Sequence, residues 1–218
     1  PLAAQGGHAS NRGWTRRTTQ RAIFLLPWGH CILTIRSHMK GIVFREFFEL
    51  VENKFSLETL DQIIEESDLP SKGAYASAGT YPHQELVTVL VKLSQHTGVT
   101  VPDLLKTFGE HLVLVFQKKF PSFFNDCKHP LDFLAGVDGY VHVEVRKLYP
   151  DAELPRFHCT RTGPDTLIMD YYSGRHLEDL AEGLIVGTLR YYGSSGNVTR
   201  EKIEKEGKAG VRFYIKLG

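Results

Sequence analysis

Residues 156–192 read RFHCTRTGPDTLIMDYYSGRHLEDLAEGLIVGTLRYY, and this stretch contains the change from strand to helix that decides the fold. Two short segments rich in β-prone residues, 156–161 and 166–172, are separated by Thr162-Gly163-Pro164-Asp165, a typical turn sequence. Residues 177–192 repeat apolar positions with the period of an amphipathic helix. The stretch therefore predicts a β-hairpin that leads directly into a helix. Gly183 and Gly187, one turn apart, predict that another helix packs closely against it.

The segments before this hairpin predict helices, and the segment after it predicts a second hairpin. Helical patterns with start or stop signals cover Gly41–Lys54, Leu57–Ser67, Pro82–Thr97, Thr100–Phe120 and Leu131–Tyr149, with a loop at Ser71–Tyr81 and a linker at Pro121–Pro130. Two further strands, 198–206 and 211–217, are expected around a turn at 205–210. The order predicts an α+β fold, in which an N-terminal helical subdomain is followed by a small antiparallel four-stranded sheet with packed helices.

The charge of the chain is unevenly distributed. The formal net charge of all 218 residues is +1, but residues 1–38 carry five arginines and no acidic residue. The remaining residues carry 21 basic and 25 acidic side chains. A body with a net negative charge lacks the basic excess that nucleic-acid binding requires, so we expect no nucleic-acid partner.

The first 38 residues differ from the rest of the chain. The chain begins with Pro1, and its apolar run at 22–35 is interrupted by Pro27 and Gly29 and is too short to span a bilayer. Arginines before an apolar run are also found in signal peptides, but no small-residue cleavage pattern follows here. We interpret residues 1–38 as an extension (an expression tag, a cloning scar or translated upstream sequence) and residues 39–218 as a single domain.

The cysteines exclude two common kinds of site. Cys31, Cys127 and Cys159 are widely spaced and form no CxxC pair, so a cysteine-ligated zinc site is not expected. An odd number of cysteines without paired spacing favours a reducing compartment over a disulfide scaffold. Together with the lack of an expected membrane span, this pattern predicts a cytoplasmic location.

Tyr171, Ser173 and Arg175 bring a phenol, a hydroxyl and a guanidinium together just before the predicted helix 177–192. If the chain stays extended, side chains at this spacing point to one face. Arginine binds carboxylates through two parallel charge-assisted bonds, and a helix N-terminus adds further affinity for anions. The cluster therefore predicts a site for one or two carboxylates, with the alternative that Ser173 is only a helix cap.

His142 lies within Val141-His-Val-Glu-Val-Arg-Lys-Leu-Tyr149 on the last predicted helix before the hairpin. Helical spacing brings Gly139 and Asp138 near its face, so that Gly139 would let a flat ligand approach and Asp138 would point aside or accept a hydrogen bond. The alternative is a partly buried imidazole that merely pairs with Asp138. A ligand with two carboxylates and a metal that needs one imidazole would use both this residue and the cluster at 171–175, and heme is such a ligand.

Four segments, taken in order, resemble the heme nitric oxide/oxygen-binding (H-NOX) family, which is related to the heme domain of soluble guanylate cyclase. They are Met39-Lys-Gly-Ile-Val-Phe, Val141-His-Val-Glu-Val-Arg-Lys-Leu-Tyr, Leu154-Pro155 and Tyr171-Tyr-Ser-Gly-Arg175. The resemblance covers residues 39–218 and leaves 1–38 as a non-family extension. It implies the family's fold, with the heme between the helical subdomain and the sheet.

The resemblance also implies a role for each candidate residue. His142 would be the axial iron ligand of heme b, and Tyr171, Ser173 and Arg175 would hold the heme propionates. Pro155 would press on the porphyrin and distort it; otherwise it only ends an irregular segment before the first strand.

The gas-binding face can be compared with the family in the same way. The resemblance places Val43, Phe47, Leu112 and Leu180 there, and oxygen-binding members resemble one another in a tyrosine where this chain has Leu180. Bound oxygen gains from a hydrogen-bond donor, whereas nitric oxide needs one far less. We therefore expect an apolar pocket that favours nitric oxide over oxygen, with carbon monoxide as a further candidate ligand.

The function implied by the resemblance is that of a bacterial, cytoplasmic nitric oxide sensor that is not itself an enzyme. Its conformational change would pass to a separate signalling protein, such as a histidine kinase or a diguanylate cyclase. Two alternatives remain. A heme enzyme of the peroxidase type would need a distal acid–base residue, and a cofactor-free helical adaptor would use the 171–175 cluster only as a capped turn.

Overall fold

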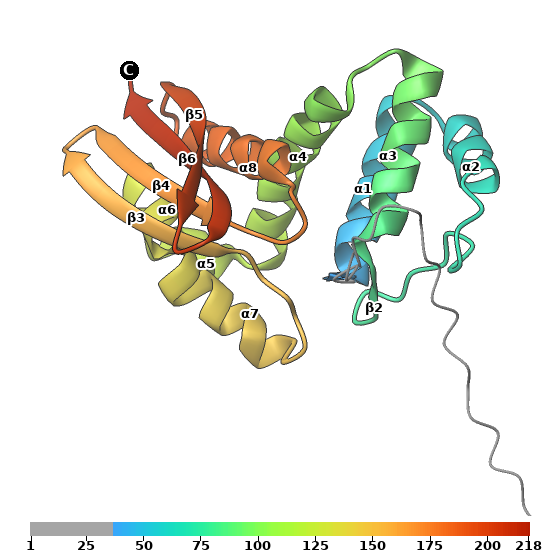
Figure 1. The fold of residues 1–218 in the computed structure, drawn as a ribbon, viewed down its shortest axis with the longest axis horizontal. Helices are drawn as coiled ribbons and strands as arrows, with labels where there is room; N and C mark the ends of the chain where they lie inside the picture. Colours follow the sequence, from blue (N-terminus) through green and yellow to red (C-terminus); the bar gives the residue numbers. More distant parts are fainter. Residues whose placement is uncertain (1–36) are drawn as a thin grey trace, which may run out of the picture. The chain divides into compact units, whose positions relative to one another are not determined.

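The computed structural model describes residues 37–218, so nearly all of the predicted extension lies outside the described part. The described residues form helices first and a four-stranded antiparallel sheet second, which confirms the predicted α+β fold (Figure 1). The elements are β1 (His38–Lys40), α1 (Gly41–Lys54), α2 (Leu57–Glu66), β2 (Thr80–Pro82), α3 (His83–Thr97), α4 (Val101–Lys119), α5 (Pro121–Asn125), α6 (Pro130–Gly136), the π-helix η1 (Val137–Val141), α7 (His142–Leu148), β3 (Arg156–Gly163), β4 (Thr166–Tyr172), α8 (Glu178–Tyr191), β5 (Gly196–Lys205) and β6 (Lys208–Leu217).

The first four helices lie within one residue of their predicted bounds, and three of them carry recognisable caps. The Ser56 hydroxyl accepts a bond from the Thr59 N–H at 3.1 Å before α2. The Thr100 hydroxyl accepts one from the Asp103 N–H at 3.3 Å before α4. Gly98 ends α3 with φ of 72°, a conformation that favours glycine.

The strands of the sheet lie in the order β3-β4-β6-β5, and every neighbouring pair is antiparallel. The second hairpin differs from its prediction, because β5 spans Gly196–Lys205 and β6 spans Lys208–Leu217, so that a turn of only two residues joins them. Both turn residues, Glu206 and Gly207, have positive φ, which matches the twist of the strands they join. Both strands begin earlier than predicted, because Gly196-Asn197 and Lys208-Ala209-Gly210 carry no alternating apolar pattern.

Three local features were not predicted. The strands β1 and β2 form a short two-stranded ribbon. His38 therefore lies in a strand, and the last residues of the loop predicted at 71–81 belong to β2. The helix α5 lies within the predicted linker. The helix predicted at 131–149 is interrupted by η1, where the N–H of His142 bonds to the carbonyl of Val137 five residues back. Gly136 and Gly139 weaken regular helical structure at this point, which favours such a wide turn.

Two hydrophobic clusters form the interior, and α8 contributes to both. Leu180 packs in the cluster of the N-terminal helices, whereas Ile185 packs in the cluster of the sheet and α6. The close packing predicted at Gly183 is confirmed, since a Cβ there would lie 2.1 Å from the carbonyl oxygen of Lys106 on α4. Gly109 on α4 approaches α8 in the same way, with a Cβ position 2.4 Å from the Leu180 carbonyl oxygen. The α4–α8 pair therefore joins the helical part to the sheet part.

None of the helices in residues 37–218 is both long enough and apolar enough to cross a membrane.

Candidate functional site

A largely apolar cavity of about 290 Å³ lies among the helices and the sheet within residues 37–218. Its walls come from β1, α1, α4, the segment from α5 to α7, the first sheet strands and α8. The polar side chains on these walls are those of Lys40, His142, Tyr149, Glu153, Tyr171, Arg175 and Thr188. A cavity of this kind suits a large apolar ligand that carries a few polar groups.

His142 is buried in the wall of this cavity, at the first position of α7. Its Nδ1 lies 3.1 Å from Oδ1 of Asp138, and its ring packs against Phe157 with the centroids 5.6 Å apart. Burial lowers the pKa of His142, while the hydrogen bond to Asp138 opposes this shift. Within residues 37–218 the ring has no other hydrogen bond, so a neutral imidazole can present Nε2 to a ligand.

The chain does not stay extended through residues 171–175, so the condition under which Tyr171, Ser173 and Arg175 would share one face is not met. The strand β4 ends at Tyr172, and the following turn includes His176 with φ of 53°. Tyr171 and Arg175 both line the cavity, whereas Ser173 does not. The Ser173 hydroxyl accepts a bond from the Arg175 N–H at 3.2 Å, so it shapes the turn. It is not the cap of α8 either, because that helix begins after Leu177 without a side-chain cap.

Arg175 is a partly buried cation held by uncharged partners. Its Nη1 donates to the carbonyl oxygens of His38 at 2.8 Å and Glu153 at 2.7 Å. It forms no ion pair with any carboxylate among the described residues, and burial lowers the pKa of its guanidinium. A buried charge is normally paired, so this guanidinium is available to an anion that enters the cavity.

Of two further residues in the prediction, Pro155 and Gly139, only the first lines the cavity. Pro155 lines the cavity just before β3. Gly139 is exposed and lies outside the cavity wall, so the expected role of Gly139 in admitting a flat ligand is wrong. The π-helix explains the difference, because its wider turn changes which residues before His142 share its face.

Phe157 was missed by the sequence analysis. Its ring lies between those of His142 and Tyr171, with centroid separations of 5.6 Å and 5.5 Å. It pairs directly with Tyr171 in the register of β3 and β4. The alternation of apolar and polar residues in β3 was visible in the sequence, but the contact between Phe157 and His142 depends on how α7 packs against the sheet.

The four residues expected at the gas-binding face do not all reach the cavity. Val43, Leu112 and Leu180 line it, whereas Phe47 is buried in the helical core against Phe108, with ring centroids 5.1 Å apart. Among the cavity-lining residues of α1, α4 and α8, the polar side chain is that of Thr188. Its hydroxyl already donates to the Leu184 carbonyl at 2.8 Å.

The segment after α7 connects the His142 helix to the β1–β2 ribbon. Asp151 accepts bonds from Lys40 Nζ at 3.0 Å and from the Thr80 hydroxyl at 2.6 Å. Glu153 accepts bonds from the Ser37 hydroxyl at 3.0 Å and the His38 N–H at 3.1 Å. Ser37 and His38, which we assigned to the extension, therefore contact the domain.

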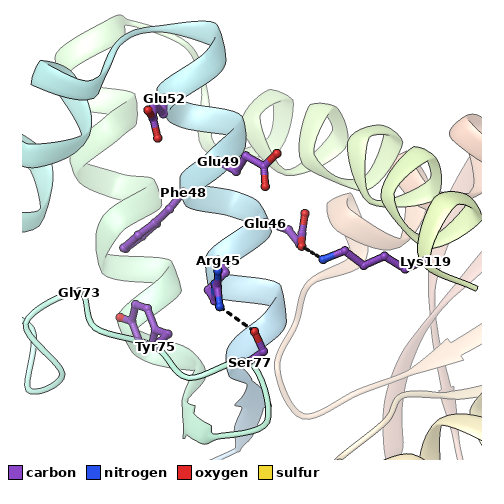
Figure 2. Close-up of a pocket in the computed structure, with 9 residues that line it drawn as sticks. All are labelled: Arg45, Glu46, Phe48, Glu49, Glu52, Gly73, Tyr75, Ser77 and Lys119. Atoms are coloured by element: carbon purple, nitrogen blue, oxygen red, sulfur yellow. Dashed lines mark hydrogen bonds and ion pairs between the residues drawn. The ribbon is translucent and has the colours of Figure 1, made fainter.

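A second, open groove of about 560 Å³ lies beside α1, the loop that follows α2 and the end of α4. Figure 2 shows Glu46 pointing to Lys119 and Arg45 pointing to Ser77, and both pairs interact. The groove is polar and contains charges of both signs, with no side chain of the predicted site on its walls. The apolar cavity is therefore the candidate functional site.

Comparison with known proteins identifies the family of the chain. The family model described as "Haem-NO-binding" matches residues 40–200. An H-NOX protein from K. algicida, solved in its unliganded Fe(II) state, is 42% identical, with a TM-score of 0.77 over 83% of this chain and 97% of that one. The IWP-051-bound H-NOX from Shewanella woodyi, solved in its Fe(II)CO state, is 38% identical, with a TM-score of 0.71 over 83% and 95%.

A curated relative extends the similarity to a larger protein. Soluble guanylate cyclase 89Db of Drosophila melanogaster is 23% identical over 143 residues, which are 63% of this chain. The chain spans only 20% of the length of that relative. The family match covers most of the described residues, and the solved relatives share their fold. The chain therefore belongs to the haem-NO-binding (H-NOX) family of heme-binding gas-sensor domains.

Proposed function

We propose that residues 39–218 form one domain that binds heme b, with His142 as the axial iron ligand, and senses nitric oxide. The observation that carries the proposal is the cavity with His142 and Arg175 in its walls. Among residues 37–218, the buried imidazole leaves Nε2 without a partner, and the guanidinium donates only to carbonyl oxygens. These groups fit a flat apolar ligand with a metal at its centre and carboxylates at its edge. Bound heme supplies the iron at which a diatomic gas is held.

The chain's own residues have distinct roles in this proposal. Arg175 and Tyr171 hold the propionates, and Ser173 supports them by shaping the turn that carries Arg175. Pro155 lies in the cavity wall, where it would press on the porphyrin. Burial excludes water from His142, which keeps its imidazole neutral and able to bind a metal.

Selectivity for nitric oxide over oxygen is proposed from the apolar walls. Val43, Leu112 and Leu180 offer no hydrogen-bond donor, and the Thr188 hydroxyl is already engaged with the Leu184 carbonyl. A bound oxygen molecule would gain no charge-assisted hydrogen bond from these residues. Nitric oxide does not depend on such a bond, and carbon monoxide is a further candidate ligand on the same ground.

We propose that the signal passes to a separate protein, such as a histidine kinase or a diguanylate cyclase, in the bacterial cytoplasm. This proposal is supported by the segment that follows α7, the helix that begins at His142. Asp151 and Glu153 in this segment form hydrogen bonds to β1, β2 and Ser37. A displacement of α7 would change these contacts and thereby move the ribbon. A two-state element of this kind allows a small change at the heme to reach a partner.

The test is the absorption spectrum of the purified ferrous protein, with and without nitric oxide, in the wild type and in His142→Gly. We expect the wild type to show a histidine-ligated heme, and His142→Gly to lose this spectrum and regain it when free imidazole is added. His158→Gly, the same exchange at an exposed position of β3, is the matched control and should retain the wild-type spectrum. A wild-type spectrum in His142→Gly without imidazole would show that another residue binds the iron.

The gas preference has its own test in the wild type. We expect nitric oxide to bind tightly, and the ferrous protein in air to oxidise slowly without forming a stable oxygen complex. A long-lived oxygen complex in air would contradict the proposed selectivity and leave heme binding itself intact.

A further inference from the structure

Asp138 lies beside His142 inside the π-helix η1, and its carboxylate is the hydrogen-bond partner of the imidazole. The distance from Nδ1 to Oδ1 is 3.1 Å. The side chain of His142 is 11% exposed and that of Asp138 is 24% exposed, so the pair lies mostly out of solvent. A hydrogen bond to a charged group in such surroundings is stronger than one between neutral groups.

The partner determines which ring nitrogen carries the proton. An ionised carboxylate can only accept hydrogen bonds, so Nδ1 of a neutral imidazole must donate to it. The lone pair of the ring is then on Nε2, which is the atom that can bind a metal. Packing of the ring against Phe157 limits its rotation, so the hydrogen bond and the aromatic contact together orient the ring.

Asp138 is the carboxylate that acts on the His142 ring, and two cations also lie near it. Arg146, one turn further along the same helix, and Arg175, from the turn after β4, are the cations near the imidazole. Neither forms an ion pair with Asp138 among the described residues, so its carboxylate is not diverted from His142.

We infer that Asp138 is a positioning residue for the proposed iron ligand: it selects the tautomer of His142 that offers Nε2 and increases the electron donation of that nitrogen to iron. This inference rests on the proposed binding of heme through His142. Residues that hydrogen-bond to a ligating histidine typically change metal affinity by about 10-fold to 100-fold when they are replaced.

The experiment compares Asp138→Asn and Asp138→Leu with the wild type in the heme-bound ferrous state. Asparagine keeps a neutral acceptor, whereas leucine removes the hydrogen bond. We expect the iron–histidine stretching frequency, measured by resonance Raman spectroscopy, to fall from wild type to Asp138→Asn and further in Asp138→Leu. The heme reduction potential should rise in the same order, because weaker donation from Nε2 stabilises the ferric state less. Heme transfer to apomyoglobin should accelerate about 10-fold in Asp138→Leu.

Glu144→Gln is the matched control, because Glu144 is a carboxylate on the same helix that pairs with Lys147, and among the described residues it forms no hydrogen bond or ion pair with His142. It should leave the stretching frequency and the potential unchanged. If Asp138 were only structural, its variants would lower thermal stability without moving either quantity, and that result would overturn the inference. Unchanged frequencies in heme-loaded variants would do the same while leaving the proposed function intact. A wild type that binds no heme, or binds it without His142, would overturn the proposed function and this inference together.

Discussion

Replacing Gly183 by alanine tests how closely α4 and α8 must approach each other. A Cβ at this position would lie 2.1 Å from the carbonyl oxygen of Lys106 and 2.8 Å from its carbonyl carbon and Cα. These are backbone atoms of α4, so no flexible side chain can move aside. Ordinary contact begins at 3.4 Å, and the helices would therefore have to separate by roughly 1 Å.

The expected cost follows from two opposing effects. Overpacking of a well-packed interface typically costs about 1–3 kcal/mol, and the contact with rigid backbone favours the upper end of this range. Alanine is better than glycine in a helix by about 1 kcal/mol, which offsets part of that cost. We expect a net loss of about 2 kcal/mol in the free energy of unfolding, or roughly 4–8 °C in melting temperature for a domain of this size.

Denaturant unfolding followed by circular dichroism, at one fixed degree of heme saturation, measures this loss. Gly136→Ala is the matched control, because a Cβ at Gly136 would meet no atom within 4 Å and its backbone is already helical. It should be neutral or slightly stabilising. Equal stability of Gly183→Ala and Gly136→Ala would refute the close approach of the two helices.

Four further changes test separate parts of the molecule. Arg175→Ala should accelerate heme loss about 10-fold or more, since a hydrogen bond to a charged group contributes about 1.5–3 kcal/mol; an unchanged dissociation rate would contradict the propionate role. Leu180→Tyr should prolong the oxygen complex measured by absorption, because it adds a hydroxyl donor to the cavity wall. Burial lowers the pKa of His111 below the ordinary histidine value of about 6.5, so unfolded chains bind more protons and stability falls as the pH drops below that value; His111→Gln should show a smaller fall in pH-dependent unfolding. A fragment that begins at Met39 should melt several degrees below one that begins at Ser37, because the Ser37 carbonyl accepts bonds from the N–H and Nδ1 of His83; equal melting temperatures would show that these bonds contribute little.

Features that depend on neighbours along the chain were predicted well. The caps at Ser56, Thr100 and Gly98 determine where helices begin and end through contacts within a few residues. The turn sequence at 162–165 predicted the hairpin, and the change from strand to helical spacing of apolar residues predicted α8. Both signals also depend only on residues close together in the chain. The glycine at 183 indicated close packing because few other reasons favour glycine inside a helix.

The candidate site was only partly predictable. The residue types at 142, 171 and 175 indicated the ligand chemistry, and the family resemblance added Pro155; the structure places these four in the walls of one cavity. Ser173 could not be placed, because the end of β4 at Tyr172 depends on pairing with β3 and β6. Phe47 was expected in the cavity but packs in the helical core instead.

The amino-acid sequence was enough to predict the α+β order of elements, most helix boundaries and three of the polar residues on the cavity wall, His142, Tyr171 and Arg175. These follow from local periodicity, caps and side-chain chemistry, which are properties of short stretches of chain. Three features became known only from the folded structure: the pairing of residues 38–40 with 80–82, the π turn before His142, and the packing of Phe157 on the imidazole ring. Each of these depends on contacts between segments far apart in the chain or on the balance between two helical turns of similar energy. No local pattern records such contacts, because the free energy that favours them is gained only when the distant segments have packed.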